Sequence, residues 1–414
     1  MERTDRQIYE EFTSELCRWP ETGLAPAAGN QDIVYVLNLE KKRLEKYGLR
    51  MTYELLPRED GKIHMLDLSI EDSRYRNRMV SESFWRKVSF YRENRKCLAI
   101  KDKELLYTII TRLEDMDAED SYCCPNCGAI SGIKELQEGC PYCHTRFLIT
   151  DLFPKVTNYY YLMEIGMEEK EGKSSIRKWL LGGAAVALVF AFPEFMEGIR
   201  NGGRILPFLS LMVSCGGGAL LGYFALSFTV IFRLLKACFE QGPKSIKQLD
   251  ARRRLIPFME QYDPTFSFEY FAGKVHTLLK ILIFTDNRKE LAVYEGEKPL
   301  EDSLFDQMID AQYGGAITLN KAETEGDYCH LDLNVYMTDV YCRNGLLYRK
   351  HDLFRVKLCK NMKRPADSGF SIKKVSCKSC GASFDASEKN RCPYCRTRYS
   401  LKEDDWVITY VGKR

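Results

Sequence analysis

The chain has 414 residues, and its 61 Lys and Arg against 58 Asp and Glu give a net charge of +3 at pH 7. This near balance excludes a global positive field that would attract nucleic acid, while the length favours two or three domains. The hydrophobic fraction of 45% is ample for buried cores. The first residues, MERTDRQIYEEF, contain no apolar run and do not fit a secretory signal. Sixteen cysteines in such a chain predict a reducing compartment, where paired cysteines bind metal.

Residues 1–122 are predicted to form an α+β domain. Apolar residues recur at helical spacing from Gln7 to Trp19, which predicts a helix with Ile8, Phe12, Leu16 and Trp19 on one face. The run from Ile33 to Tyr47 is ambiguous at its start and helical at its end, and Gly48 closes it. Strand-like runs follow at Leu49 to Leu56, Lys62 to Ile70, Phe84 to Tyr91 and Leu105 to Leu113, with a turn at Asp60-Gly61 between the first two. Helices followed by an antiparallel meander are typical of the α+β class.

Two CxxC pairs follow this domain, and two more occur near the end of the chain. The two pairs of each set lie eleven or twelve residues apart, which is typical of tetrahedral Zn²⁺ bound by four thiolates. Such a site is closed, and therefore structural rather than catalytic. We predict zinc ribbons at 123–165 and 376–414, each with one structural Zn²⁺. The predicted ligands are Cys124, Cys127, Cys140 and Cys143 in the first ribbon and Cys377, Cys380, Cys392 and Cys395 in the second.

Other candidate donors are weaker. Cys123 could compete with Cys124, although only Cys124 leaves the two-residue gap to Cys127. His144 could be a spare donor or a solvated ring. Cysteines at five other positions are interpreted as small core residues: Cys17, Cys97, Cys329, Cys342 and Cys359.

Two apolar runs lie in the middle of the chain, from Trp179 to Phe192 and from Ile205 to Phe232. The second has 28 residues without a charge, more than the roughly 20 that cross a bilayer as a helix. We predict a transmembrane helical hairpin over 173–236, with spans at about 179–199 and 205–232. The alternatives are a buried helix pair in a soluble core, or a crossing by the second run alone. Glycines such as Gly218 and Gly222 would let the two helices approach closely.

Basic residues flank the outer ends of the hairpin. Lys173, Arg177 and Lys178 precede it, and Arg233 and Lys236 follow it. The positive-inside rule therefore predicts a two-pass protein of the plasma membrane with both termini in the cytoplasm. Residues 237–262 are expected to form a juxtamembrane helix interrupted at Gly242-Pro243. Its triplet Arg252, Arg253 and Arg254 would either contact anionic lipid or lie on a solvated face.

The segment 263–375 is interpreted as a second copy of the first domain. CPYCHTRF in one half and CPYCRTRY in the other are nearly identical. Four shorter matches were found in the same order: Tyr47-Gly48 with Tyr313-Gly314, Leu66 to Leu68 with Leu331 to Leu333, Arg74 to Asn77 with Tyr341 to Asn344, and Phe84 to Val88 with Leu353 to Lys357. The chain is therefore predicted to be an internal duplication.

The second half resembles the bacterial Tim forty-four-like proteins, which are membrane-anchored relatives of the mitochondrial import-motor tether. The resemblance lies in DPTFSFEYF from Asp263 to Phe271, the following helix and meander, and DDWV from Asp404 to Val407 after the ribbon. It covers about 150 residues, and the first half lacks the DPxF opening. It implies a cone-shaped fold of the nuclear-transport-factor-two-like type, membrane association, and binding of protein or lipid without catalysis.

These observations predict a non-catalytic tethering protein that binds membrane lipid and a protein partner, in protein transport or envelope maintenance. We hypothesise that the two copies pack as an internal pseudo-dimer. One alternative is a small-molecule or hydrolytic pocket, for which His64 with Asp67 and His330 with Asp332 are the candidate acid–base pairs. Another is nucleic-acid binding by the ribbons, which is not expected because a basic, aromatic-studded face is lacking.

Overall fold

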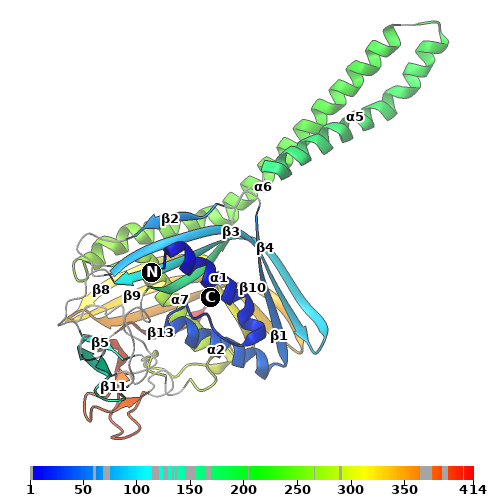
Figure 1. Cartoon of the computed structure of the whole chain (residues 1–414). Helices are drawn as coiled ribbons and strands as arrows, with labels where there is room; N and C mark the ends of the chain where they lie inside the picture. Colours follow the sequence, from blue (N-terminus) through cyan, green and yellow to red (C-terminus); the bar gives the residue numbers. More distant parts are fainter. Residues whose placement is uncertain are drawn as a thin grey trace. The chain divides into compact units, whose positions relative to one another are not determined.

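The computed structural model describes residues 3–414 except 59–61, 69–74, 114–120, 125–128, 133–134, 136–137, 145–153, 164–168, 204, 265, 289–290, 364–374, 385–389 and 404. The chain forms two compact units. The first combines Met1–Glu164 with Ser245–Arg414, and the second is Ile165–Lys244. The elements are drawn in Figure 1, where colour follows the sequence.

The first half begins with the two predicted helices. α1 (Asp5–Thr22) starts at a capping box formed by Thr4 and Gln7 and ends at Gly23, whose φ of 72° suits glycine. All four residues of its predicted apolar face are buried, so the helical spacing identified this element correctly. α2 (Gln31–Lys46) starts at the N-cap Asn30, and the chain turns at Gly48 with a φ of 61°.

An antiparallel sheet follows in the order β1-β3-β4-β7, and β2 also pairs with β3. Its strands are β1 (Leu49–Pro57), β2 (His64–Asp67), β3 (Tyr75–Arg92), β4 (Arg95–Leu113) and β7 (Lys155–Met163). β1 and β2 pair with different parts of β3, so they do not form a hairpin with each other. The turn predicted at Asp60-Gly61 lies outside the described residues.

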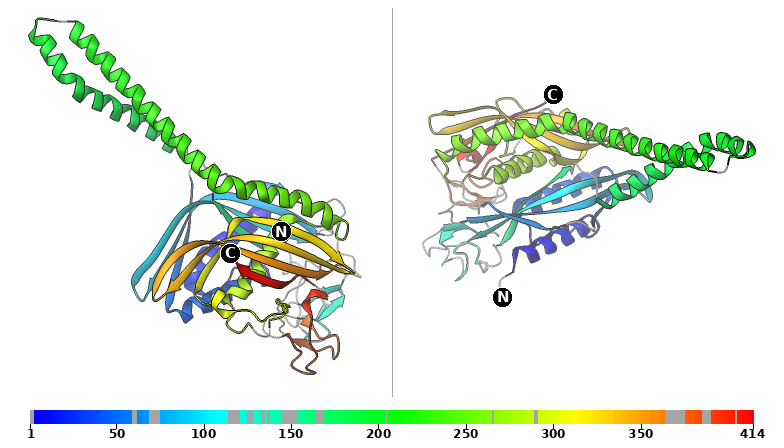
Figure 2. Two further views of the ribbon diagram at one scale, coloured as in Figure 1. Left: turned by 180° about the vertical axis from the view of Figure 1, so that it is seen from behind. Right: turned by 90° about the horizontal axis from the view of Figure 1, so that it is seen from above.

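The second half repeats this arrangement. Within the first unit, the second half begins with the end of α6 (Leu206–Glu260). α7 (Phe268–Phe284) and the short η1 (Asp302–Leu304) follow. The strands β8 (Met308–Glu325), β9 (Tyr328–Arg343), β10 (Leu346–Asn361) and β13 (Val407–Lys413) form a sheet in the order β13-β10-β9-β8. The fold class is therefore α+β with two antiparallel sheets, which Figure 2 shows from two further sides.

The strand order supports an internal duplication, but the short sequence matches do not, because they join strands that do not correspond. In sheet order, β3 corresponds to β9 and β4 to β10. Phe84 to Val88 lies in β3 whereas Leu353 to Lys357 lies in β10, and Leu66 belongs to β2 whereas Leu331 belongs to β9. Those matches are wrong, because alternating strands of one composition resemble one another out of register. A parallel bridge recurs in each half, Gly29 with Val156 and Tyr294 with Ile408.

The last strand of each sheet lies beyond its cysteine segment. β7 pairs with β4, and β13 pairs with β10. The ranges 123–165 and 376–414 that we assigned to the ribbons therefore each end in a strand of the main sheet. The cysteine segments are insertions before the fourth strand, each opening with a two-stranded hairpin: β5 (Ser121–Cys123) with β6 (Ile130–Gly132), and β11 (Val375–Ser376) with β12 (Ser383–Phe384).

Two apolar cores fill the first unit, and α2 contributes to both. Ile33 and Leu37 of α2 pack with α1 and the first sheet, whereas Val36 and Leu39 pack with α7 and the second sheet. The end of α6 joins the second core through three residues: Ala251, Leu255 and Met259. The apolar face of this helix end is thus covered by protein, and Arg252 forms a 2.8 Å ion pair with Glu269.

The second unit is a hairpin of α5 (Glu169–Arg200) and the first part of α6. Two segments, Ile176–Arg200 and Leu206–Thr229, are long and apolar enough to cross a bilayer. In the first segment, no residue of the most apolar 18-residue window is buried. In the second segment, 11% of that window is buried. The alternative of a buried helix pair in a soluble core is therefore wrong.

α6 continues through Gly242 and Pro243, so the predicted interruption is also wrong. The helix tolerates the loss of one backbone hydrogen bond at the proline.

Glycines allow the two hairpin helices to touch. A Cβ built on Gly183 would lie 2.1 Å from the carbonyl oxygen of Gly218, and one on Gly222 would lie 2.2 Å from that of Trp179. The neighbouring Gly182 has nothing within 4 Å of such an atom. Side chains larger than hydrogen are thus excluded at Gly183 and Gly222, and also at Gly218, where a Cβ would lie 2.5 Å from the carbonyl oxygen of Gly183.

We expect Gly183→Ile to force the hairpin helices apart, because its side chain would overlap the Gly218 backbone. Overpacking of this kind costs about 1–3 kcal/mol. The unfolding midpoint of the protein in detergent should fall, and its migration in SDS gels should change. Gly182→Ile adds the same side chain without a clash and is the matched control. Equal effects of the two variants would contradict the packing described here.

Candidate metal centres and the buried seam

Four thiols converge in the second half of the chain. The Sγ atoms of Cys377, Cys380, Cys392 and Cys395 all lie within 4.8 Å of one another. Two of the separations are 3.5 Å (Cys377 to Cys395) and 3.6 Å (Cys380 to Cys392). Tetrahedral Zn²⁺ with Zn–S bonds of about 2.3 Å places its sulfurs roughly 3.8 Å apart. This donor set and spacing could hold such an ion.

Three of the four predicted cysteines converge in the first half. The Sγ atoms of Cys124, Cys140 and Cys143 lie within 4.8 Å of one another, and Cys124 is 3.7 Å from Cys143. Cys127 lies outside the described residues. The structure therefore brings together seven of the eight predicted ligands, in two groups that could each bind a metal.

The backbone around the two groups follows one pattern. The N–H of Cys124 donates to Ala129 O at 2.8 Å, and that of Cys377 donates to Ala382 O at 2.9 Å. This equivalence makes Cys124, rather than Cys123, the counterpart of Cys377. His144 and Arg396 follow the last cysteine of each group at positive φ, 56° and 61°. Each of them donates its backbone N–H to the first cysteine of its CPYC pair.

Local hydrogen bonding favours a thiolate at one ligand position. Thr397 Oγ1 lies 3.2 Å from Cys395 Sγ. The hydrogen bond between these two side chains lowers the pKa of Cys395 to about 6. Metal ligation requires deprotonated sulfur, so the environment of this cysteine suits the predicted role.

The remaining predicted donors take no part in these groups. Cys329, Cys342 and Cys359 are buried as expected, whereas Cys97 is exposed and Cys17 is half-buried. His64 and Asp67 are exposed on β2. Asp332 accepts a bidentate hydrogen bond from Arg355. Neither His–Asp pair is buried at the base of a cavity among the described residues.

A second concentration of polar contacts lies where the two halves meet, which we call the seam: the contacts of α2 with α7, β8 and the loop after α7. Arg43 of α2 is buried and donates to Ile283 O at 2.7 Å and to Asp306 O at 3.2 Å. Arg288 donates to Leu282 O at 2.7 Å and also to Ile283 O at 3.0 Å. The two guanidinium groups thus cap the last carbonyls of α7, where the helix dipole favours positive charge.

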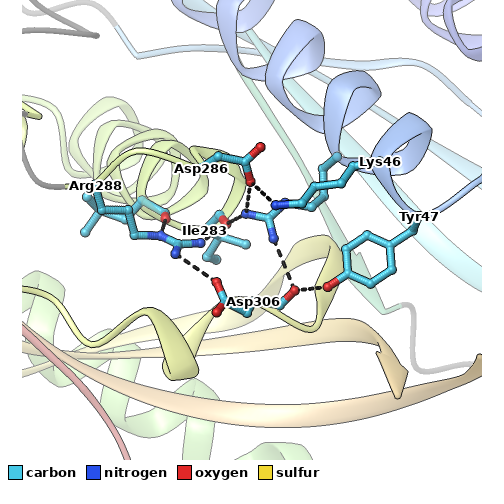
Figure 3. A network of polar contacts seen from close by, with 8 residues as sticks. Lys46, Tyr47, Ile283, Asp286, Arg288 and Asp306 are labelled. Carbon is cyan, nitrogen blue, oxygen red and sulfur yellow. Dashed lines mark hydrogen bonds and ion pairs between the residues drawn. The ribbon is translucent and has the colours of Figure 1, made fainter. Parts of the chain in front are cut away.

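Surface groups complete this network, as Figure 3 shows. Lys46 forms a 2.8 Å ion pair with Asp286, and the hydroxyl of Tyr47 donates to Asp306 O. Burial alone would raise the pKa of Asp286, but the hydrogen bond from Lys46 and the charge of Arg43 lower it. The end of α2 and the end of α7 are therefore joined by charge-assisted bonds.

A buried carboxyl group lies further along the seam. Glu40 of α2 is 2% exposed, and Lys280 Nζ of α7 lies 3.8 Å from its Oε2. Burial raises the pKa of Glu40 to about 8; Lys280 opposes the shift and Asp310 of β8 adds to it. Beside Glu40 is a cavity of about 10 Å³, also lined by Arg86, Tyr53 and Asp310, which has room for roughly one water molecule.

Glu40 makes the seam sensitive to pH. Its pKa is about 8 in the folded protein against 4.5 as the ordinary value, so the folded state holds this proton more tightly. Its contribution to stability is complete below pH 4.5 and is lost as the pH rises toward 8. Between pH 5 and pH 7 we expect the free energy of unfolding to fall by about 2–3 kcal/mol from this group.

Denaturant titrations of the wild type and of Glu40→Gln over this pH range test the prediction. The variant should lose most of the slope with pH, because its amide does not titrate. Glu45→Gln, on the exposed side of the same helix, should keep the slope. A wild-type slope that Glu40→Gln leaves unchanged would show that another group is responsible.

Sequence reasoning missed these seam residues, although a signal was present. Lys280 stands inside the apolar run LLKILIF, and Glu40 lies one turn from the buried Val36 and Leu37. A charge on the apolar face of a helix indicates a buried partner. Lys274 of α7 is a third case, 3.4 Å from Asp32 and 2.5 Å from Asp405; these two carboxylates raise its pKa against the effect of burial.

The residues that carry the family resemblance meet in space. The ring centroid of Phe271 lies 5.6 Å from that of Phe266 and 5.4 Å from that of Trp406. The DPTF and DDWV segments therefore pack on the same aromatic ring. A scan against protein-family models finds no match to this chain, and a search of curated proteins finds no similar one.

Proposed function

We propose that this chain is a membrane-anchored, non-catalytic protein that tethers or receives a protein segment or lipid at the membrane. The observation that carries the proposal is the hairpin, whose large apolar side chains point outward. Val189, Phe190 and Phe228 are 69%, 78% and 70% exposed. A surface of this kind is stable in lipid and not in water.

The proposed topology follows from charge. Basic residues lie at the outer ends of the hairpin, so both termini belong in the cytoplasm and the plasma membrane is the expected location. The two cysteine groups would each bind one structural Zn²⁺ and form a ribbon, with Cys127 as the fourth ligand of the first. A closed four-thiolate site stabilises its segment and leaves no open position for chemistry.

The two halves of the first unit would form an internal pseudo-dimer of nuclear-transport-factor-two-like domains. The shared strand order, the use of α2 in both cores and the capping of α7 by Arg43 support this pairing. Membership of the Tim forty-four-like family, and a role in protein transport or envelope maintenance, rest on the motif residues around Phe271 and are part of the same proposal.

The alternative of a small-molecule or hydrolytic pocket has weaker support. The cavity beside Glu40 is lined by polar groups, and the indole N–H of Trp19 in its wall is buried without a partner among the described residues. A volume near that of one water molecule suits a bound water better than a substrate.

Fractionation of cells that produce the full chain tests membrane anchorage. The protein should sediment with membranes, resist extraction at alkaline pH and be released by detergent. Affinity purification after solubilisation, with mass spectrometry of both proteins and lipids, should then identify the partner. Recovery of the full chain from the supernatant without detergent would end the proposal, although the metal assignment would survive.

A further inference from the structure

Cross-strand rows of basic and aromatic residues cover part of the first sheet, on the side away from its core. The register aligns Arg50 with Tyr91 and Lys96, Glu54 with Lys87 and Lys101, and Leu56 with Trp85 and Lys103. The buried Met51, Val88 and Phe90 belong to the opposite side. We call this set of residues on β1, β3 and β4 the basic face. It carries five cations and one carboxylate, Glu54.

Aromatic rings hold several of these cations in place. The guanidinium of Arg50 lies 4.9 Å from the ring centroid of Tyr91, on which Lys96 also lies at 5.7 Å. Lys101 Nζ lies 4.8 Å from the ring centroid of Trp85. Arg50, Lys96 and Lys101 are exposed to solvent. The positive charges are therefore arranged over a broad sheet surface, with both aromatic rings already occupied by cations.

The second half offers an internal comparison. On the corresponding side of its sheet, the register aligns Lys321, Asp332 and Lys357 in one row and Thr318, Asn334 and Arg355 in another. Glu323 and Glu325 lie on the same side of β8, so three cations meet three carboxylates. Arg355 is paired with Asp332 at 2.6 Å, and Lys321 is paired with Glu323. The excess of positive charge is thus found on the sheet of the first half and not on that of the second. Solubility alone does not require it.

We infer that the basic face binds the anionic phospholipid headgroups of a bilayer. A broad array of cations fits a plane of phosphates, and each basic residue near an anionic surface strengthens binding about fivefold. Single-stranded nucleic acid instead needs open aromatic rings for its bases to stack on, and here cations cover the rings. The inference rests on the proposed membrane anchorage, which brings a bilayer to the same chain.

Cys97 provides a native probe of this face. It is exposed and follows Lys96, at the bulge where β4 leaves the turn from β3. The full chain would be inserted into lipid nanodiscs of phosphatidylcholine alone or of phosphatidylcholine with phosphatidylglycerol. The rate at which an uncharged maleimide labels Cys97 would be measured by site-resolved mass spectrometry. We expect phosphatidylglycerol to slow labelling at least about fivefold at low salt, and high salt to remove the protection.

Two double charge reversals distinguish an effect of the basic face from an effect of the net charge of the protein. Lys101→Glu with Lys103→Glu should abolish the protection. Lys321→Glu with Lys357→Glu changes the net charge equally on the balanced face and should retain it. If phosphatidylglycerol does not change the labelling rate of Cys97 in a disc-bound chain, the inference is overturned while membrane anchorage stands. A chain that fails to stay with the discs would instead refute the proposed function. Protection by a single-stranded oligonucleotide, but not by phosphatidylglycerol, would reassign the face to nucleic acid.

Discussion

Cys392→Ser is expected to reduce the zinc content of the purified protein from two ions per chain to one. Cys392 is 1% exposed, and its sulfur lies 3.6 Å from that of Cys380. A serine hydroxyl is a poor substitute for thiolate, so the second cysteine group would lose its ion. Structural Zn²⁺ contributes about 10–16 kcal/mol to the folding of small zinc domains, which makes this the largest effect we predict. Elemental analysis of detergent-purified protein gives the stoichiometry.

The consequences should extend beyond the cysteine segment. Cys377, Cys392 and the aromatic pair Phe384 and Tyr399 belong to the core of the second half. Loss of the ion should therefore loosen the attachment of β13 and increase proteolysis between residues 364 and 404. Cys97→Ser, an exchange at an exposed thiol outside both groups, is the control and should retain two ions. Two ions in Cys392→Ser, or none in the wild type, would contradict the metal assignment.

Arg43→Met is expected to lower the free energy of unfolding of the first unit by about 3 kcal/mol, the scale expected for the loss of two hydrogen bonds from a charged donor to buried carbonyls. The side chain of Arg43 is 1% exposed, and it supplies one of the two guanidinium caps on the end of α7. Methionine fills a similar volume, so the change removes the charge and the hydrogen bonds rather than the packing. Denaturant unfolding in detergent, followed by circular dichroism, measures the loss.

Lys46→Met is the matched control, because Lys46 belongs to the same helix and contacts the same Asp286. Its side chain is 55% exposed, and an exposed ion pair contributes about 0–1 kcal/mol. Arg288 still donates to Ile283 O in the Arg43 variant, so the α7 carbonyls keep one donor. A loss no greater than that of Lys46→Met would show that Arg288 alone is sufficient and that Arg43 does not hold the halves together.

Local sequence patterns predicted much of this architecture. Ile8, Phe12, Leu16 and Trp19 recur at 3.6-residue spacing, and that spacing alone located α1. Uncharged length located the two hairpin helices, because a run of about 20 apolar residues is long enough to cross a bilayer as a helix. The cysteine groups were found from their CxxC spacing, since a tight turn brings two sulfurs within reach of one ion whatever the surrounding fold.

Tertiary structure decided which strands correspond and what lies between the halves. The matches that linked Phe84 to Val88 with Leu353 to Lys357 joined the wrong strands, because pairing partners far apart in the chain leave no local trace. The return of β7 and β13 to their sheets beyond the cysteine segments is likewise a long-range event. Glu40 and Lys280 stand among apolar residues, which indicates a buried partner, but the sequence does not say which residue that partner is or that Arg43 joins them. Only the packing of α2 against α7 makes them buried, because burial depends on a surface supplied from some 240 residues away.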